Sequence, residues 1–156
     1  GLAHQLGISR GEAKDYITSY FEKFPGIKKY MDETIRRARD DGYVETIFGR
    51  RTHVGGINDK NPAMRGYAER QAINAPIQGA AADVIRRAMI RVKSETLRQM
   101  LLQVHDELIF ECPKAEADET MGVVRGVMEK AHLPAVDLSV PLVVEAKAGR
   151  NWDEAH

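Results

Sequence analysis

Three ionisable residues, His105, Asp106 and Glu107, interrupt two short and mostly apolar runs of the sequence. The runs cover residues 100–104 and 108–112 and are typical of two strands joined by a tight turn. Such a turn would hold carboxylates at the rim of a sheet, and hard oxygen ligands of this kind suit Mg²⁺. Because aspartate is also common in ordinary turns, the alternative is a solvated tip without a chemical role.

A second group of polar residues recurs at every fourth position: Arg70, Asn74 and Gln78. On a helix this spacing puts all three on roughly one face, provided that Pro76 does not turn Gln78 away. All three side chains present hydrogen-bond donors, and A·T and T·A pairs both expose acceptors in the minor groove. These three side chains could therefore bind a DNA duplex in the minor groove without sequence specificity. A solvated helix face is the alternative.

Other familiar chemical arrangements are missing from the sequence. It has no second cluster of His and Cys at zinc-ligand spacing, no Gly-x-Ser-x-Gly motif and no Walker phosphate loop. No run approaches the roughly 18 apolar residues of a membrane helix, and no secretory signal opens the chain. Since Cys112 is the single cysteine and cannot form an internal disulfide, we expect a cytoplasmic protein with no membrane partner.

The N-terminal third of the chain predicts two helices. Ser9 and Glu12 have capping-box spacing at the start of the first, and Pro25 suits the first turn of the second, which Gly42 ends. We expect the two helices to form a hairpin. The first carries a stripe at helical spacing that should pack in the core: Ala13, Tyr16, Ile17, Tyr20, Phe21 and Phe24.

The row of polar residues should lie on a later helix. Asn61 followed by Pro62 predicts its N-terminus, and Pro76 and Gly79 should kink or interrupt it. A further helix is expected from residue 80 to about residue 97. Val124 and its neighbours at helical spacing predict another helix after the second apolar run.

The remaining regular structure should be β. Residues 43–47 and 51–54 predict a short hairpin with Gly49 at its turn and paired arginines at its tip. Residues 140–146 predict a last strand. The fold class is therefore α+β, with an antiparallel sheet centred on the hairpin at residues 100–112.

Size and charge limit the classes of protein to which the chain can belong. A chain of 156 residues and 17.5 kDa, 43% hydrophobic and 29% charged, is one compact globular domain or a slice of a larger one. Its zero formal charge hides a gradient, because residues 36–98 carry thirteen basic and seven acidic side chains, whereas residues 106–156 carry five and eleven. A basic stretch suits phosphate contact, and solvated helix faces are the alternative. The start at Gly1 suggests a fragment.

Several segments resemble, in the same order, the motifs of the family A DNA polymerases. The segment Gln103-Val104-His105-Asp106-Glu107-Leu108 looks like the family's third motif. The other similar segments are Gly42-Tyr43-Val44-Glu45-Thr46, Gly49-Arg50-Arg51, Glu69 to Gly79, Ala81-Ala82-Asp83 and Asn151-Trp152. The resemblance covers nearly the whole chain and implies a C-terminal fragment that carries part of the fingers, at about residues 1–78, and part of the palm, at about residues 79–156.

The resemblance also implies roles for the residues singled out above. Asp106 would be a Mg²⁺ ligand in two-metal nucleotidyl transfer, Glu107 a supporting carboxylate at the metal, and His105 a group that positions the primer terminus. Primer-template DNA and deoxynucleoside triphosphates are the implied partners. Three residues would touch the DNA near the insertion site, Arg70, Asn74 and Gln78, and Arg65 is a further candidate for its backbone.

The fragment itself is expected to have little or no polymerase activity. No segment matches the family's Asp-x-Ser-x-Ile-Glu motif, which supplies the second metal-binding aspartate, and the nucleotide-binding fingers helix should precede Gly1. We also expect the isolated chain to self-associate through apolar faces of a truncated sheet. Two alternatives stay open: a non-catalytic nucleic-acid-binding module and a His-Asp metal-dependent phosphohydrolase, whose ligands would lie on helices.

Overall fold

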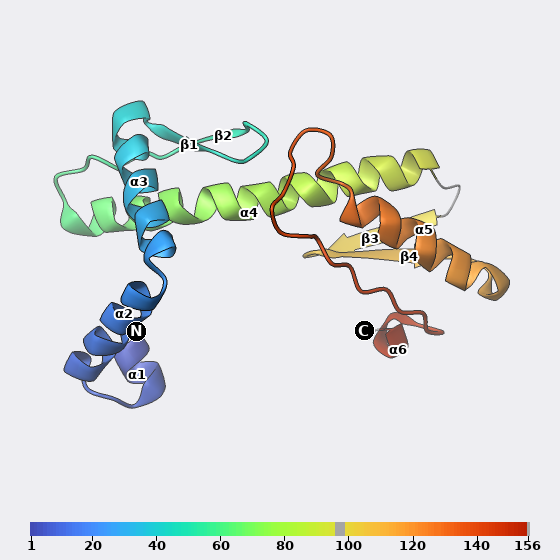
Figure 1. The fold of residues 1–156 in the computed structure, drawn as a ribbon, viewed down its shortest axis with the longest axis horizontal. Helices are drawn as coiled ribbons and strands as arrows, with labels where there is room; N and C mark the ends of the chain where they lie inside the picture. The colour runs from blue at the N-terminus through green and yellow to red at the C-terminus, as the bar shows by residue number, and fades with distance from the viewer. Residues whose placement is uncertain (96–98, 156) are drawn as a thin grey trace. The chain divides into compact units, whose positions relative to one another are not determined.

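The computed structural model describes residues 1–95 and 99–155, and its helices and small antiparallel sheets confirm the α+β class (Figure 1). The chain forms two compact units. Unit 1 consists of residues 1–44 and 51–75, and unit 2 consists of residues 45–50 together with the chain from residue 76 onward.

Unit 1 begins with three helices: α1 (Leu2–Leu6), α2 (Arg10–Lys23) and α3 (Pro25–Asp41). The predicted capping box is confirmed, because Glu12 N–H donates to Ser9 Oγ at 3.2 Å and Ser9 N–H donates to the Glu12 carboxylate at 2.9 Å. The hydrogen bond that the Ser9 backbone N–H donates to the Glu12 carboxylate lowers the pKa of this carboxyl, and the Ser9 side chain lowers it further. Gly42 ends α3 in the left-handed conformation, with a φ of 77°.

The predicted hairpin of α2 and α3 is wrong. Only Phe24 separates the two helices, and one residue is too short a connection for the chain to fold back. Figure 1 shows α3 continuing away from the end of α2. The predicted burial of the aromatic stripe is wrong too: Ala13 is buried, but Tyr16 and Tyr20 are 64% and 48% exposed.

The core of unit 1 forms where α3 and the first half of α4 meet the strands between them. The hairpin consists of β1 (Tyr43–Glu45) and β2 (Arg51–His53), and α4 spans Pro62–Glu95. The core is built from small and β-branched side chains: Ala38, Val44, Val54, Ile57, Ala68 and Ala72. The Tyr30 hydroxyl donates to the Ile73 carbonyl at 2.9 Å, and burial raises the pKa of that hydroxyl.

Helix α4 continues through Pro76 and Gly79, so the expected interruption of the helix at these residues is wrong. Asn61 caps its N-terminus, since the Asn61 side chain accepts from Ala63 N–H at 2.9 Å. Pro76 removes a single backbone donor, and helical residues continue on both sides of it. The predicted end of this helical region at about Leu97 lies outside the described residues.

Unit 2 packs a hairpin against two helices. The hairpin is β3 (Gln99–Val104) and β4 (Glu107–Glu111), followed by a short 3₁₀ turn, η1 (Lys114–Glu116), and by α5 (Ala117–Glu129). The predicted hairpin and the predicted helix after it are therefore confirmed. Their core joins the end of α4 to α5 and to one face of the hairpin: Val92, Val124 and Val127, with Met100, Phe110 and Met128 packed against them.

The β3–β4 ladder contains a bulge. Met100 pairs with Phe110 and Leu102 pairs with Ile109, so Leu101 is an extra residue in β3. Leu101 and Leu102 are 47% and 49% exposed. A bulge bends its strand and increases the local twist, so it changes the direction in which the following turn points.

The predicted strand at residues 140–146 is wrong. This part of the chain is irregular and belongs to neither sheet that the described residues form, although the short helix α6 (Trp152–Ala155) follows it. A strand needs hydrogen-bonded neighbours, and an alternating sequence pattern alone cannot supply them. Val140 and Val143 are 70% and 80% exposed.

Candidate active site and nucleic-acid interface

The tip of the β3–β4 hairpin holds the predicted catalytic residues. His105 and Asp106 form the two-residue turn, and both are exposed. His105 has a φ of 51°, a left-handed conformation that residues other than glycine rarely adopt. Glu107 is half-buried as the first residue of β4 and pairs with Val104 across the ladder. The turn thus presents an imidazole and a carboxylate to solvent, with a second carboxylate at its base.

This geometry suits part of a metal site. The Asp106 and Glu107 carboxylates are hard oxygen donors, which Mg²⁺ prefers, and an octahedral shell would need additional oxygens beside them. In the part of the chain that the structure describes, no three His, Cys, Asp or Glu side chains are grouped closely enough to hold a metal ion. The His-Asp pair lies in a turn between strands, which counts against the phosphohydrolase alternative.

The predicted DNA-contacting row is exposed along α4. Arg70 and Asn74 lie in unit 1 and Gln78 in unit 2, and all three side chains face solvent. Ala68 and Ala72, which are fully buried, lie on the opposite side of the helix because two residues correspond to about 200° of rotation. The residues on both sides of Pro76 are helical, so all three positions belong to α4.

Arg65 has a local partner. Its Nη1 donates to the Asp59 carbonyl at 3.1 Å, in the loop that leads into α4. The side chain is half-buried rather than fully extended into solvent. The structure therefore gives Arg65 a role in holding this loop, beside the DNA-backbone contact suggested by the resemblance.

A polar network at the tip of the β1–β2 hairpin was missed by the sequence analysis. Within unit 2, Asp83 accepts from Thr46 Oγ1 and from Arg50 Nε, each at 2.8 Å, and Arg50 Nη2 donates to the Gly79 carbonyl at 3.0 Å. A Cβ atom at Gly79 would lie 2.6 Å from Thr46 Cγ2, so the close approach requires glycine. The sequence offered one indication of this network: Gly79 and Asp83 are four residues apart and therefore lie on the same face of a helix.

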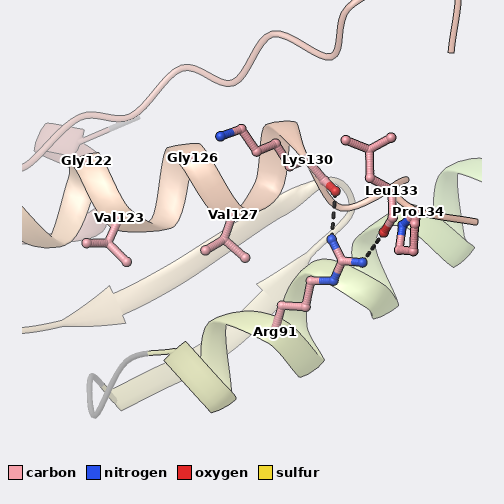
Figure 2. Close-up of a pocket in the computed structure, with 8 residues that line it drawn as sticks. All are labelled: Arg91, Gly122, Val123, Gly126, Val127, Lys130, Leu133 and Pro134. Atoms are coloured by element: carbon pink, nitrogen blue, oxygen red, sulfur yellow. Dashed lines mark hydrogen bonds between the residues drawn. The ribbon is translucent and has the colours of Figure 1, made fainter. Parts of the chain in front are cut away.

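Two arginines of α4 hold the chain that follows α5. Arg87 Nε donates to the Ala131 carbonyl at 2.8 Å, and Arg91 Nη1 donates to the Lys130 carbonyl at 2.7 Å. Figure 2 shows Arg91 reaching the carbonyls of Lys130 and Leu133 beside an open depression lined in part by α5. Guanidinium groups at these carbonyls satisfy backbone acceptors at the C-terminal end of a helix.

No helix among residues 1–95 and 99–155, α4 included, combines the length and apolar character needed to cross a lipid bilayer.

Comparisons with known proteins agree on one family. Residues 1–154 match the model of the family described as DNA polymerase family A. Over 163 residues the chain is 55% identical to DNA polymerase I of Rhizobium leguminosarum, covering 100% of this chain and 16% of that protein. It is 52% identical to DNA polymerase I of Streptococcus pneumoniae over 160 residues, covering 99% of this chain and 18% of that protein.

A solved structure shares the fold. The POL domain of Pol1 from M. smegmatis, in complex with DNA primer-template and dNTP, superposes with a TM-score of 0.90 at 44% sequence identity. The match covers 99% of this chain and 28% of that one. The chain thus spans less than a fifth of the full length of the two relatives above.

Proposed function

Because the chain belongs to DNA polymerase family A, we propose that it is part of a DNA-directed DNA polymerase that adds deoxynucleotides to a primer 3′ end. The observation that carries the proposal is the exposed His105–Asp106 turn, with Glu107 at its base. The family's motif coincides here with a geometry that leaves a carboxylate open to solvent. We further propose that unit 1 corresponds to the fingers side and unit 2 to the palm portion.

Asp106 is the proposed Mg²⁺ ligand, and Glu107 is the supporting carboxylate. Bound metal would stabilise the charge that develops on the attacking and leaving oxygens during nucleotidyl transfer. The protein's own contribution is to hold the Asp106 carboxylate at the end of a paired hairpin, whose strands fix the direction of the turn. His105, in the same turn, positions the primer terminus.

The row on α4 is the proposed contact with primer-template DNA. Arg70, Asn74 and Gln78 all offer donors from exposed positions, which suits the acceptors that every base pair presents in the minor groove. Arg65 would reach the DNA backbone through the guanidinium nitrogens that do not bond Asp59. The surplus of basic residues between positions 36 and 98 adds attraction for phosphate.

For the chain by itself we propose DNA binding without synthesis. The row and the basic stretch lie within these residues, whereas two-metal transfer in the family needs a second aspartate from a motif that the sequence does not contain. A pure preparation of the chain that extended a primer with Mg²⁺ and all four nucleotides would contradict this part of the proposal.

The main test is Mg²⁺-dependent primer extension by the full-length parent and its Asp106→Ala variant. We expect kcat to fall on the order of 10³-fold, as for the loss of other preorganised electrostatic groups, with primer-template binding retained. Asp15→Ala is the matched control because Asp15 is an exposed carboxylate in α2. Equal extension by the Asp106→Ala variant and the unmodified enzyme would reject the metal-ligand role.

A further inference from the structure

One arginine bonds the tip of the β1–β2 hairpin to both ends of a single turn of α4. Arg50 Nη2 donates to the Gly79 carbonyl at 3.0 Å, and Arg50 Nε donates to the Asp83 carboxylate at 2.8 Å. Gly79 and Asp83 are four residues apart, so the guanidinium group spans about one helical turn. Its planar fork of donors holds the two acceptors in fixed directions.

The Thr46 hydroxyl completes this network and uses its full set of hydrogen bonds. It accepts from the backbone N–H groups of Phe48 and Arg50, at 3.3 and 3.2 Å, and it donates to Asp83 at 2.8 Å. Thr46 is 5% exposed, and the Asp83 side chain is 16% exposed. Since a satisfied polar network away from water makes its surroundings rigid, the hairpin tip holds a defined position against this turn of α4.

A second contact holds the same tip one turn further along α4. The guanidinium group of Arg87 lies 5.2 Å from the centre of the Phe48 ring, and Arg87 Nε donates to the Ala131 carbonyl at 2.8 Å. Asp83 and Arg87 are four residues apart and lie on one face of the helix. All of these contacts are made within unit 2. This part of α4 is therefore fixed on the C-terminal side of Gly79.

Gln78 directly precedes the fixed turn, and its side chain is exposed. On its other side, Pro76 contributes no backbone donor, so the helix has one hydrogen bond fewer near Gln78. A side-chain amide can meet the same base pair in every turnover only if its backbone keeps a constant direction. The bond from Arg50 to the Gly79 carbonyl fixes the backbone at the next residue.

We propose that Arg50 is a positioning residue for Gln78, with Asp83 and Thr46 holding its guanidinium group in place. This role rests on the proposed contact between Gln78 and primer-template DNA. Arg50 acts through the backbone of Gly79, and its loss lets the amide of Gln78 move away from the position that favours transfer. A displacement of about 1 Å in a positioned group can lower a rate on the order of 10²-fold.

The test is a double-mutant cycle in the full-length parent, read out as kcat/KM for the incorporation of one deoxynucleotide. Gln78→Ala should lower kcat/KM about tenfold, a typical effect of losing one hydrogen bond. Arg50→Ala should lower it between about threefold and tenfold. Added to Gln78→Ala, Arg50→Ala should cause no further loss, because it acts only through Gln78. Arg125→Ala, the matched control at an exposed arginine of α5 in unit 2, should leave kcat/KM unchanged.

Two results would overturn the role of Arg50 alone. One is an unchanged kcat/KM in Arg50→Ala, and the other is a double variant in which the two losses multiply, as they would if Arg50 only stabilised the fold. An unchanged Gln78→Ala enzyme would reject the proposed DNA contact itself, and the role of Arg50 with it.

Thermal unfolding checks that each variant folds. If Arg50→Ala does not, Arg50→Lys takes its place in the cycle. Lysine keeps the charge, but its single ammonium group lacks the fork that bonds the Gly79 carbonyl and Asp83 together. The same two results decide the outcome for that variant.

Discussion

The two β-hairpins that the structure describes have tips in opposite surroundings. The tip at residues 46–50 is held to α4 by Asp83, and Thr46 is 5% exposed. The tip at His105 and Asp106 is exposed. The polar side chains at the first tip bond the protein, whereas the His105 and Asp106 side chains at the second tip face solvent. Polar residues at a turn therefore indicate a site only when their hydrogen-bonding capacity is not already used by the fold.

The largest effect on stability should come from Gly79→Ala. The added methyl would meet Thr46 Cγ2 at 2.6 Å and Arg50 Nη2 at 3.0 Å, so the first tip must shift, at a cost of about 2 kcal/mol. Gly122→Ala, inside α5 with open space around its Cβ, should instead stabilise by about 0.5–1 kcal/mol through helix propensity. Urea unfolding followed by circular dichroism measures both. Equal effects at the two glycines would contradict the close approach.

Asp83→Ala should be the next largest change. It removes the acceptor of two hydrogen bonds at the first tip, one of them charge-assisted, and leaves the buried Thr46 hydroxyl without that partner. Since Arg50 is half-exposed and partly screened by solvent, we expect a loss of about 1.5 kcal/mol in the free energy of unfolding. A double-mutant cycle with Arg50→Ala measures the interaction free energy between Arg50 and Asp83. If the effects of the two substitutions are strictly additive, the ion pair contributes nothing to stability.

At the second tip, His105→Gly should raise the free energy of unfolding by up to about 1 kcal/mol. Glycine adopts a φ of 51° without the steric cost that a side chain incurs there, partly offset by its greater entropy in the unfolded chain. The same variant of the parent should extend primers less well, because the imidazole is lost. Unfolding and primer-extension assays give the two readouts; a less stable variant would show that His105 holds the turn together.

The smallest effect on stability should come from Asp106→Asn. The Asp106 side chain is exposed, so its substitution should change the free energy of unfolding by less than about 0.5 kcal/mol. Urea unfolding of the variant, run beside Asp83→Asn, would compare the two tips directly. If Asp106→Asn and Asp83→Asn destabilise the protein equally, the proposed difference between the two hairpin tips is wrong.

Local patterns predicted those parts of the fold that depend on neighbouring residues. The Ser9 capping box, the Asn61 cap and the strand-turn-strand patterns of both hairpins could be recognised because each is completed within a few positions. The exposed turn at His105 and Asp106 could also be predicted from the sequence, because the two strands that flank it are its immediate neighbours in the chain.

The predictions that were wrong, and the network that was missed, depend on residues far apart in the sequence. The aromatic stripe of α2 has core periodicity, but burial requires a surface to pack against, and Tyr16 and Tyr20 remain exposed. Residues 140–146 alternate like a strand, but a ladder needs a neighbour. The Thr46, Arg50 and Asp83 network joins segments more than thirty residues apart, which no local pattern encodes.

Because Leu101 is an extra residue in β3, the direction of the turn at His105 and Asp106 depends on the number of residues in this strand more than on their types. Deleting Leu101 would leave Met100 opposite Phe110 and Leu102 opposite Ile109, so the ladder could close without loss of a pair. The strand would straighten, and the turn that carries Asp106 would point elsewhere. Deletion of Leu101 should therefore change the direction of the Asp106 carboxylate, whereas a substitution of Leu101 that keeps the bulge should not.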